Sequence, residues 1–372
     1  MTTQPTAIPK LYIGMDIHKK SWAVHFRTDI SDHKSLTLPP VCDVLYNYIQ
    51  SHFPDHQVAI TYEAGCCGFS AAREFLNYGW EVKVVNPADV PRGHKQTHQK
   101  TDKIDCRNLA KQLQTDQLHG VYIPGEEQDM LKSLVRQRAE VTRQFRSVKA
   151  NIKSLLLYHG IQLPEQFDNP NWSKDFLLWL NGIQWPHPTG KSCLDSKLRI
   201  FNAVKAEYLQ LANELRAYCR KHFKTDYYLL KSIPGVGGYL AASILAEVGD
   251  LRRFNNYKQF ASYIGLIPSV RNSGGTENIY GVTPRCRALL RSYIIESSWV
   301  ALRLDPSIQT YYRKHKGRNP KSILIKIAHK MLNRMLSVIK NNKPYQISNS
   351  DMESLKIKMK STSKKQTAKQ QE

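Results

Sequence analysis

The stretch LYIGMDIH, residues 11–18, decides the fold class of the N-terminal part of the chain. Apolar side chains alternate along it with a glycine and an aspartate, Gly14 and Asp16. Alternation with a period of two is typical of a β-strand that is buried on one face. We therefore expect a strand that carries Asp16 close to its end.

The segments that follow this strand predict an α/β domain. In order they are two short strands, an amphipathic helix, a strand, a helix and a strand, at residues 21–26, 34–38, 43–53, 57–64, 69–79 and 81–87. Three early strands followed by alternating helix and strand fit an RNase-H-like (RuvC-like) fold better than a simple doubly wound sheet. We place this domain at residues 1–124.

The middle of the chain predicts a helical, coiled-coil-like linker at residues 125–225. Apolar residues recur at three- and four-residue steps over residues 125–158, and arginines and lysines line much of the remaining surface. A stretch with Trp and Pro at residues 160–190 interrupts the helix, which resumes over residues 195–222. The basic surface suits a phosphate backbone or a partner helix, or is simply solvated.

Residues 226–345 predict a second domain made of helices and turns. SIPGVGGYLAASILAE, residues 232–247, has the pattern of a helix-hairpin-helix. Gly235 and Gly237 would let backbone amides approach a phosphate next to a helix N-terminus, a contact that positions DNA without reading its sequence. The alternative is a glycine-rich turn that serves packing only. Residues 346–372, rich in Ser, Lys and Gln, predict a disordered basic tail.

The charge of the chain indicates a polyanionic partner. Lys and Arg number 54 against 31 Asp and Glu, which gives a formal charge of +23 spread along the sequence. Nucleic acid is the usual partner of such a surface, although a basic protein without one is the alternative. Seven cysteines lack the spacing of a disulfide framework, and no signal core or long apolar run is present. We expect a soluble protein of a prokaryotic cytosol or nucleoid, without membrane association.

Four acidic residues form the candidate catalytic set. Asp16 and Glu63 end two predicted strands, on faces whose small residues would leave room for a ligand. Asp102 and Asp105 lie three residues apart, on one side of a predicted helix. If the two strands are neighbours and the helix crosses their ends, the four carboxylates converge.

Such a convergence predicts a divalent metal site. Carboxylates at close range repel each other, and Mg²⁺, or alternatively Mn²⁺, removes that conflict. Two ions of this kind can activate an attacking oxygen and stabilise a leaving oxygen at one phosphodiester. The flanking cations Lys19, Lys20, Lys100 and Lys103 would hold the nucleic acid strand. The alternative is that each acid is an ordinary surface residue, with Asp102 as a helix cap.

These residues also carry a family resemblance. YIGMDIHKK around Asp16, TYEAGCCGFSAAREFL around Glu63 and KTDKIDCRNLA, which contains the aspartate pair, resemble the DEDD transposases of the IS110 insertion-sequence family, relatives of the Piv-type DNA invertases. SIPGVGGYLAASILAEVGD and FASYIGLIPSVRNSGG extend the resemblance to about residue 340. Cys106 stands where the family often has Ala.

The resemblance implies an activity, a cofactor and partners. Members of the family move or invert DNA by site-specific recombination, with Mg²⁺ at the four acids and a serine of the C-terminal domain as nucleophile. Some are guided by a structured RNA, transcribed from the element's non-coding end, that pairs with donor and target DNA. Because recombination joins two duplexes, a homodimer or homotetramer is expected.

Ser273, in NSGGTENIYGVTPRCRALLR, is the candidate nucleophile. It precedes two glycines, and we expect it on an open, flexible loop among Arg271, Arg285 and Arg287, which would bind nucleic acid. A serine hydroxyl needs a base or metal for activation, which the first domain would supply if the domains close over DNA. The residues alone favour an ordinary turn serine, the resemblance favours the nucleophile, and Ser269 is the second choice.

Two other functions remain open at this point. One is a RuvC-like, structure-specific nuclease in which water attacks the phosphodiester, and which therefore forms no covalent protein–DNA adduct. The other is a basic scaffold that binds nucleic acid without catalysis and needs neither the acidic set nor a metal.

Overall fold

The computed structural model describes residues 8–91, 101–273 and 276–347, and only the backbone for the part of residues 270–280 that falls within these ranges. The chain divides into two compact units between Glu127 and Gln128. None of the helices in the described part combines the length and apolar character that a bilayer span requires.

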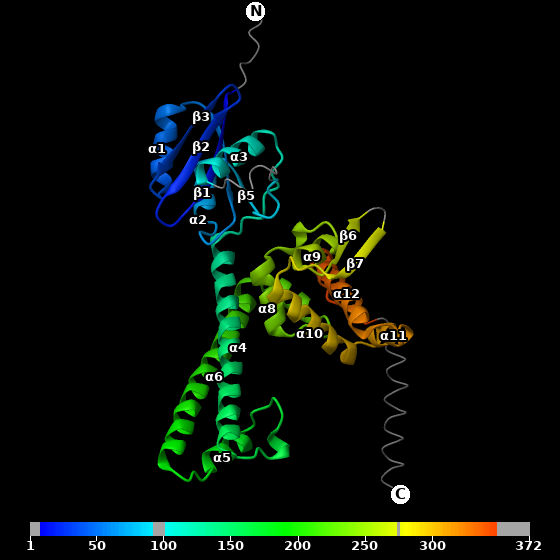
Figure 1. Ribbon diagram of the computed structural model, residues 1–372. Helices are drawn as coiled ribbons and strands as arrows, with labels where there is room; N and C mark the ends of the chain where they lie inside the picture. Colours follow the sequence, from blue (N-terminus) through cyan, green and yellow to red (C-terminus); the bar gives the residue numbers. More distant parts are fainter. Residues whose placement is uncertain (1–7, 92–100, 274–275, 348–372) are drawn as a thin grey trace, which may run out of the picture. The chain divides into compact units, whose positions relative to one another are not determined.

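The first unit contains a five-stranded mixed sheet with the order β3-β2-β1-β4-β5 (Figure 1). Its strands are β1 Lys10–Ile17, β2 Trp22–Thr28, β3 Asp32–Leu38, β4 Gln57–Glu63 and β5 Glu81–Val85. β1, β2 and β3 are antiparallel neighbours, whereas β4 runs parallel to β1 and β5. The helices are α1 Cys42–His52, α2 Ser70–Asn77 and α3 Asp102–Gln114. Each strand and helix predicted for this part of the chain is confirmed.

The two faces of the sheet are covered by different helices. Leu11, Ile13 and Met15 of β1 are fully buried in one core with residues of α1 and α2. On the other face, α3 packs so closely on Gly14 that a Cβ there would lie 2.0 Å from the carbonyl oxygen of Cys106. The prediction that small residues leave this face open to a ligand is therefore wrong, because they make room for α3.

An ion pair fixes α3 to the edge of the sheet. The Arg107 Nε donates to Asp32 Oδ2 at 2.8 Å, and the buried His25 ring contacts Asp32 Oδ1 at 2.7 Å. Although partial burial opposes the effect, the hydrogen bonds from His25 and Arg107 hold the pKa of Asp32 at about 2. The helix that carries Asp102 and Asp105 is thus held by β1 beneath it and by β3 beside it.

The second unit begins with two long helices, α4 Glu126–Tyr158 and α6 Pro188–His222 (Figure 1). They share an apolar core with the short helices η2 Glu165–Phe167 and α5 Lys174–Gly182. The prediction of helix over residues 125–158 is confirmed, while the return to helix comes at Pro188, seven residues earlier than predicted, because proline is favoured in a first helical turn. Arg138 of α4 lies between the rings of Tyr208 and Tyr239, at 4.0 and 4.1 Å, and so ties α4 to α6 and to the helix α8 Gly238–Val248.

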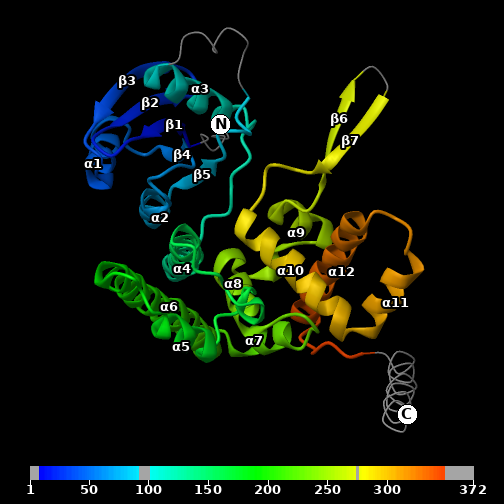
Figure 2. The same ribbon diagram turned by 60° about the horizontal axis from the view of Figure 1, so that its bottom comes forward.

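The remaining helices surround a single large core. They are α7 Lys224–Lys231, α8 Gly238–Val248, η3 Leu251–Arg253, α9 Tyr257–Ile264, α10 Ala288–Leu304, α11 Pro306–Lys314 and α12 Pro320–Asn341. Between α9 and α10, the strands β6 Pro268–Ser273 and β7 Thr276–Val282 form an antiparallel hairpin (Figure 2). The prediction that this part consists of helices and turns only is therefore wrong for residues 268–282. A two-residue Gly-Gly connection is a preferred hairpin link, which explains the strands.

Candidate active site

The strand register brings the first two acids to neighbouring positions. β1 and β4 run parallel, and their last aligned pair is Met15 with Tyr62. Asp16 and Glu63 are the next residues of the two strands, so the two residues lie side by side at the carboxyl ends of β1 and β4. This is the placement that the sequence predicted for them.

The third acid reaches Asp16 from the start of α3. Thr101 is the N-cap of this helix and accepts from the backbone N–H of Ile104, so Asp102 is not the capping residue. The ligand atoms of Asp16, His18 and Asp102 all lie within 4.8 Å of one another. His18 Nε2 is 3.2 Å from Asp16 Oδ2 and 3.7 Å from Asp102 Oδ2. The close packing of α3 on Gly14 is what makes this approach possible.

Glu63 and Asp105 lie outside this group of mutually close ligand atoms, as far as the described residues show. The charge of Asp105 nonetheless acts on the neighbouring Cys106 thiol, as do those of Asp16 and Asp102. Burial, and then the Asp16 carboxylate, raises the pKa of Cys106 to about 12. Cys106 therefore stays a neutral thiol, and its Sγ donates to the Ala23 carbonyl at 3.1 Å. Three of the four predicted acids act on this thiol by their charge.

The donor set fits a divalent cation. Two carboxylates offer the oxygen ligands that Mg²⁺ and Mn²⁺ accept, and the imidazole nitrogen of His18 is a ligand that suits Mn²⁺ better than Mg²⁺. Sequence reasoning missed His18, although its place two residues after Asp16, just beyond the end of β1, was a signal. The residues that would hold an ion here are Asp16, His18 and Asp102. Asp105 lies on the same helix as Asp102, and Glu63 ends the strand next to β1.

We expect His18→Ala to weaken Mn²⁺ binding about tenfold and Mg²⁺ binding much less, because only the softer ion gains from a nitrogen ligand. Isothermal titration of the purified protein with each metal measures this. His52→Ala removes an exposed imidazole from α1, where its ring contacts Tyr48 of the preceding turn, and serves as the control. Equal Mn²⁺ affinity in wild type and His18→Ala would exclude the imidazole as a ligand.

Exposed lysines border the acidic group. Lys19 and Lys20 follow His18, and Lys103 follows Asp102, all with exposed side chains. Lys100 lies outside the described residues. The placement suits the predicted role of Lys19, Lys20 and Lys103 in holding a phosphate backbone, which stays a prediction.

Ser273 is the last residue of β6, opposite Thr276, and Arg271 lies in the same strand. The expectation that Ser273 sits on an open loop is therefore wrong for its backbone, while its side chain is among those not described. Arg285 and Arg287 are exposed and follow β7 at the foot of the hairpin. The backbone N–H of Arg287 donates there to the backbone carbonyl of Ile264. Six strand residues of about 3.3 Å each span roughly 20 Å, so the hairpin separates Ser273 from these arginines.

The two candidate phosphate-binding glycines differ in their surroundings. Gly235 has a φ of +94°, and a Cβ there would lie 2.7 Å from the backbone oxygen of Ser297, whose hydroxyl donates to the Gly235 carbonyl. Its absence of a side chain thus serves the packing of the turn on α10. Gly237 is exposed at the N-cap of α8 with open space around it. A phosphate contact at Gly237 fits this geometry and remains a prediction, as does one at Gly235.

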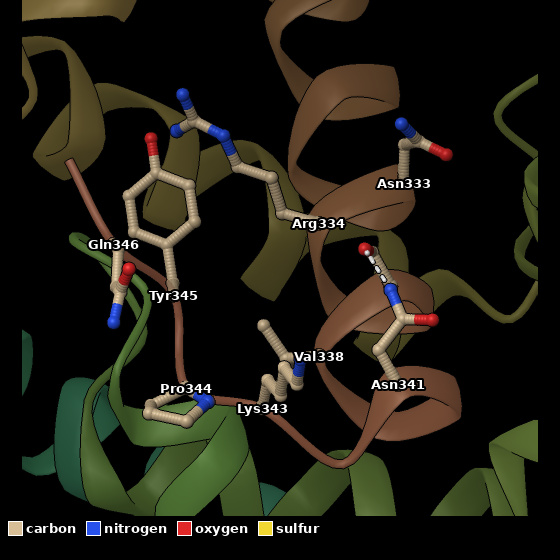
Figure 3. Close-up of a pocket in the computed structure, with 9 residues that line it drawn as sticks. Asn333, Arg334, Val338, Asn341, Lys343, Pro344, Tyr345 and Gln346 are labelled. Carbon is tan, nitrogen blue, oxygen red and sulfur yellow. Dashed lines mark hydrogen bonds between the residues drawn. The ribbon is translucent and has the colours of Figure 1, made fainter. Parts of the chain in front are cut away.

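A hollow of about 490 Å³ lies in the second unit, between the end of α12 and the segment that follows it (Figure 3). Arg334 is held there by Asp305, at 2.7 Å, and by the Tyr345 ring, at 4.5 Å. Asn341 donates to the hydroxyl of Ser337. None of the predicted site residues lines this hollow. Its contacts, chiefly those of Arg334 with Asp305 and Tyr345, hold the segment after α12 in place.

Comparisons with known proteins give two domain matches. A model described as "Transposase", of the DEDD type of IS110, matches residues 13–160, and one described as "Transposase IS116/IS110/IS902 family" matches residues 227–313. A relative from Sinorhizobium fredii is 28% identical over 242 residues, which cover 65% of this chain and 58% of the relative. The transposase for insertion sequence element IS1111A of Coxiella burnetii is 25% identical over 62% of each chain.

A further relative is similar along almost its whole length. The pilin gene-inverting protein of Moraxella lacunata is 23% identical over 352 residues, 90% of this chain and 98% of the relative. In contrast, this chain spans less than two thirds of the Sinorhizobium and Coxiella proteins. Both matched domains contain predicted site residues, the acids in the first and Ser273 in the second.

Proposed function

Because this chain belongs to the IS110/IS116 family of transposases and carries both of its domains, we propose that it is an insertion-sequence recombinase that cuts and rejoins DNA. The first unit would be its RNase-H-like (RuvC-like) catalytic domain. The observation that carries the proposal is the approach of the Asp16 and Asp102 ligand atoms, together with His18, to within 4.8 Å. Scaffolds that only bind nucleic acid have no need for such a costly juxtaposition of like charges.

The proposed metal site consists of Asp16, Glu63, Asp102 and Asp105, with His18 as an additional ligand. A bound Mg²⁺ or Mn²⁺ would polarise the phosphodiester and stabilise the oxygen that leaves it. The carboxylates of Asp16 and Asp102, on β1 and α3, would hold that ion in place and so fix where the scissile phosphate binds. Lys19, Lys20 and Lys103, which border them, would hold the neighbouring phosphates.

The proposed nucleophile is the Ser273 hydroxyl. Its oxygen would form a bond to phosphorus while the sugar oxygen of the strand leaves and takes up a proton. Attack of a new sugar hydroxyl on this phosphoserine would reverse the reaction and join another strand, so that no further energy source is needed. Ser273 and the acids belong to different units of the chain, so the complete site would form only in a complex with nucleic acid.

The proposed partners follow from the same chemistry. Donor and target DNA are the substrates, and a structured guide RNA from the element would select them by base pairing. A homodimer or homotetramer would supply the paired active sites that exchange between two duplexes requires, and the prokaryotic cytosol or nucleoid is where such DNA lies. Within the second unit we propose a further boundary near residue 225, with a basic tail after residue 345.

A reconstitution experiment tests the proposal. The purified chain is combined with DNA that carries the element ends and with RNA transcribed from the non-coding end, in Mg²⁺, Mn²⁺ or EDTA. We expect cleavage and rejoined products with either metal and at least about a hundredfold less in EDTA. Cleavage without a covalent protein–DNA adduct would point to a nuclease that uses water, and metal-independent cleavage would exclude the acidic site.

A further inference from the structure

Four cations gather where α4 packs on the C-terminal helices. Lys132 and Arg136 belong to α4, Arg253 to η3, and Arg287 to the segment just before α10. We call these four residues the basic cluster. α4 is fixed at this point, because Leu131 and Val135 are buried in the same core as α8, α9 and α10.

One tyrosine and one glutamate hold the cluster together. The guanidinium carbons of Arg253 and Arg287 lie 4.8 and 4.6 Å from the centre of the Tyr263 ring. The Tyr263 hydroxyl donates to the backbone carbonyl of Glu247, at 3.2 Å. The Glu247 carboxylate in turn lies 3.4 Å from the Nε of Arg136. Residues from three separate elements are therefore within a few ångströms of one Tyr–Glu pair.

Lys132 is the unusual member, because it is only 5% exposed. It lies one turn before Arg136, on the same face of α4. Burial, and then the charge of Arg287, lowers the pKa of Lys132, and the nearby acids Asp129 and Glu247 oppose this only in part. Among the described residues the Lys132 ammonium makes no hydrogen bond or ion pair, and it is not one of the fully buried nitrogens without a partner, so its tip reaches solvent.

The basic cluster therefore has more positive than negative charge around Lys132. The acids whose charges act on Lys132 are Asp129 and Glu247, and Glu247 is already engaged by Arg136. A largely buried lysine whose ammonium makes no hydrogen bond within the described part of the chain, and on which the charge of Arg287 acts, is unfavourable unless an anion binds between the two. The cluster is open to such an anion, because Arg287 and Arg136 are exposed to solvent.

One member of the cluster, Arg287, lies between the end of β7 and the start of α10, and Figure 2 shows the foot of the β6–β7 hairpin beside α9 and α10. The backbone N–H of Arg287 donates to the backbone carbonyl of Ile264, and that of Thr283 donates to the carbonyl of Ile267. These two bonds close the hairpin at this end. Gly265 packs directly on Cys286, where a Cβ would meet the Cys286 Cβ at 2.3 Å. An anion in the basic cluster would thus have a fixed position relative to the base of the hairpin that ends at Ser273.

We infer that the basic cluster binds a phosphodiester group of the nucleic acid, with Lys132 and Arg287 as its principal donors. The phosphate oxygens supply the acceptor that the Lys132 ammonium lacks and separate it from the Arg287 guanidinium. Such a contact positions a strand along the hairpin without reading its sequence. The inference rests on the proposed function only in taking nucleic acid as the partner.

The test uses the full chain and two labelled single-stranded probes of one sequence, a DNA and an RNA, titrated over a series of salt concentrations. For the probe that the site holds, Lys132→Met is expected to lower affinity about tenfold and the slope of log affinity against log salt by about one. Arg287→Gln is expected to act in the same direction. Lys326→Met removes the same charge from an exposed position on α12 and is the matched control.

Thermal unfolding without nucleic acid gives a second, independent measurement. Lys132→Met should unfold at the same temperature as wild type or higher, because it replaces a buried charge by an apolar side chain of similar shape. A lower unfolding temperature with unchanged affinity would make Lys132 a structural cation and overturn the inference. The inference would also be overturned if Lys132→Met lost no more affinity than Lys326→Met for both probes. If wild type binds neither probe, the proposed function fails as well.

Discussion

Asp16→Asn is expected to lower the rate of DNA strand cleavage at least about a thousandfold, equivalent to roughly 4 kcal/mol of transition-state stabilisation. Asp16 is the second-last residue of β1, the central strand of the sheet, and its carboxylate lies close to both His18 and Asp102. Replacing it by an amide removes a negative ligand from the proposed metal site without changing the shape of the side chain. No basic residue is altered, so affinity for nucleic acid should stay within about twofold.

Two measurements separate a loss of chemistry from a loss of structure. Cleavage is followed on DNA with element ends under saturating Mg²⁺, and binding is followed by titration of the same DNA. Asp55→Asn, an exposed acid in the turn before β4, is the control and should cleave at the wild-type rate. Asn tolerates the positive φ of 63° at that position. Cleavage by Asp16→Asn within tenfold of wild type would remove Asp16 from the catalytic set.

The N-terminal unit could be predicted because its sequence pattern has one interpretation at each step. Leu11, Ile13 and Met15 alternate with Gly14 and Asp16, and this period fixes both the strand and the face that packs on α1 and α2. The ends of the elements are marked by turn residues, such as Gly79 with its φ of +81°. The neighbourhood of Asp16 and Glu63 then follows from the pairing of β1 with β4.

What covers the second face of that sheet could not be predicted from the same pattern. Gly14 indicates that something approaches closely, but a ligand and a helix make the same demand at this level. The structure resolves it, since the Cys106 carbonyl and the Ala110 N–H of α3 occupy the space. The missed contribution of His18 has a similar cause, because its position relative to Asp102 depends on how α3 is held by Asp32.

The sequence carries a signal for the β6–β7 hairpin. Gly274 and Gly275 separate two segments of strand-like composition, which is the usual pattern of a tight hairpin. Lys132 gave no such signal, because it is an ordinary lysine on an amphipathic helix. Its burial arises only when α4 packs on α8 and η3, a tertiary contact that local sequence does not encode.

Ser273→Ala is expected to eliminate covalent protein–DNA adducts and to lower strand exchange at least about a thousandfold. The substitution removes the only atom that the proposed reaction takes from this residue. Ser273 ends a strand, where Ala is tolerated at a cost of a few tenths of a kcal/mol. Folding and assembly with nucleic acid should therefore remain close to wild type, as thermal unfolding and binding titrations can verify.

Mapping the adduct tests both the residue and the chemistry. Cleavage products are trapped from wild-type protein and DNA, and the modified peptide is identified by mass spectrometry. Ser269→Ala is the control, since Ser269 lies four residues earlier in β6, about 13 Å along the strand. An adduct on Ser269 or on Tyr280 of β7 would show that Ser273 is the wrong residue while leaving covalent catalysis in place.

The same experiment shows whether the acids and the serine act in one step. If Ser273 attacks a phosphodiester that the metal site activates, Asp16→Asn and Ser273→Ala each block adduct formation. The double variant should then be no slower than either single one, because groups that act as a unit lose their effect together. Multiplied losses would instead mean two separate reactions, one using water at the acidic site. Strand exchange by Ser273→Ala at the wild-type rate would exclude serine catalysis at this position.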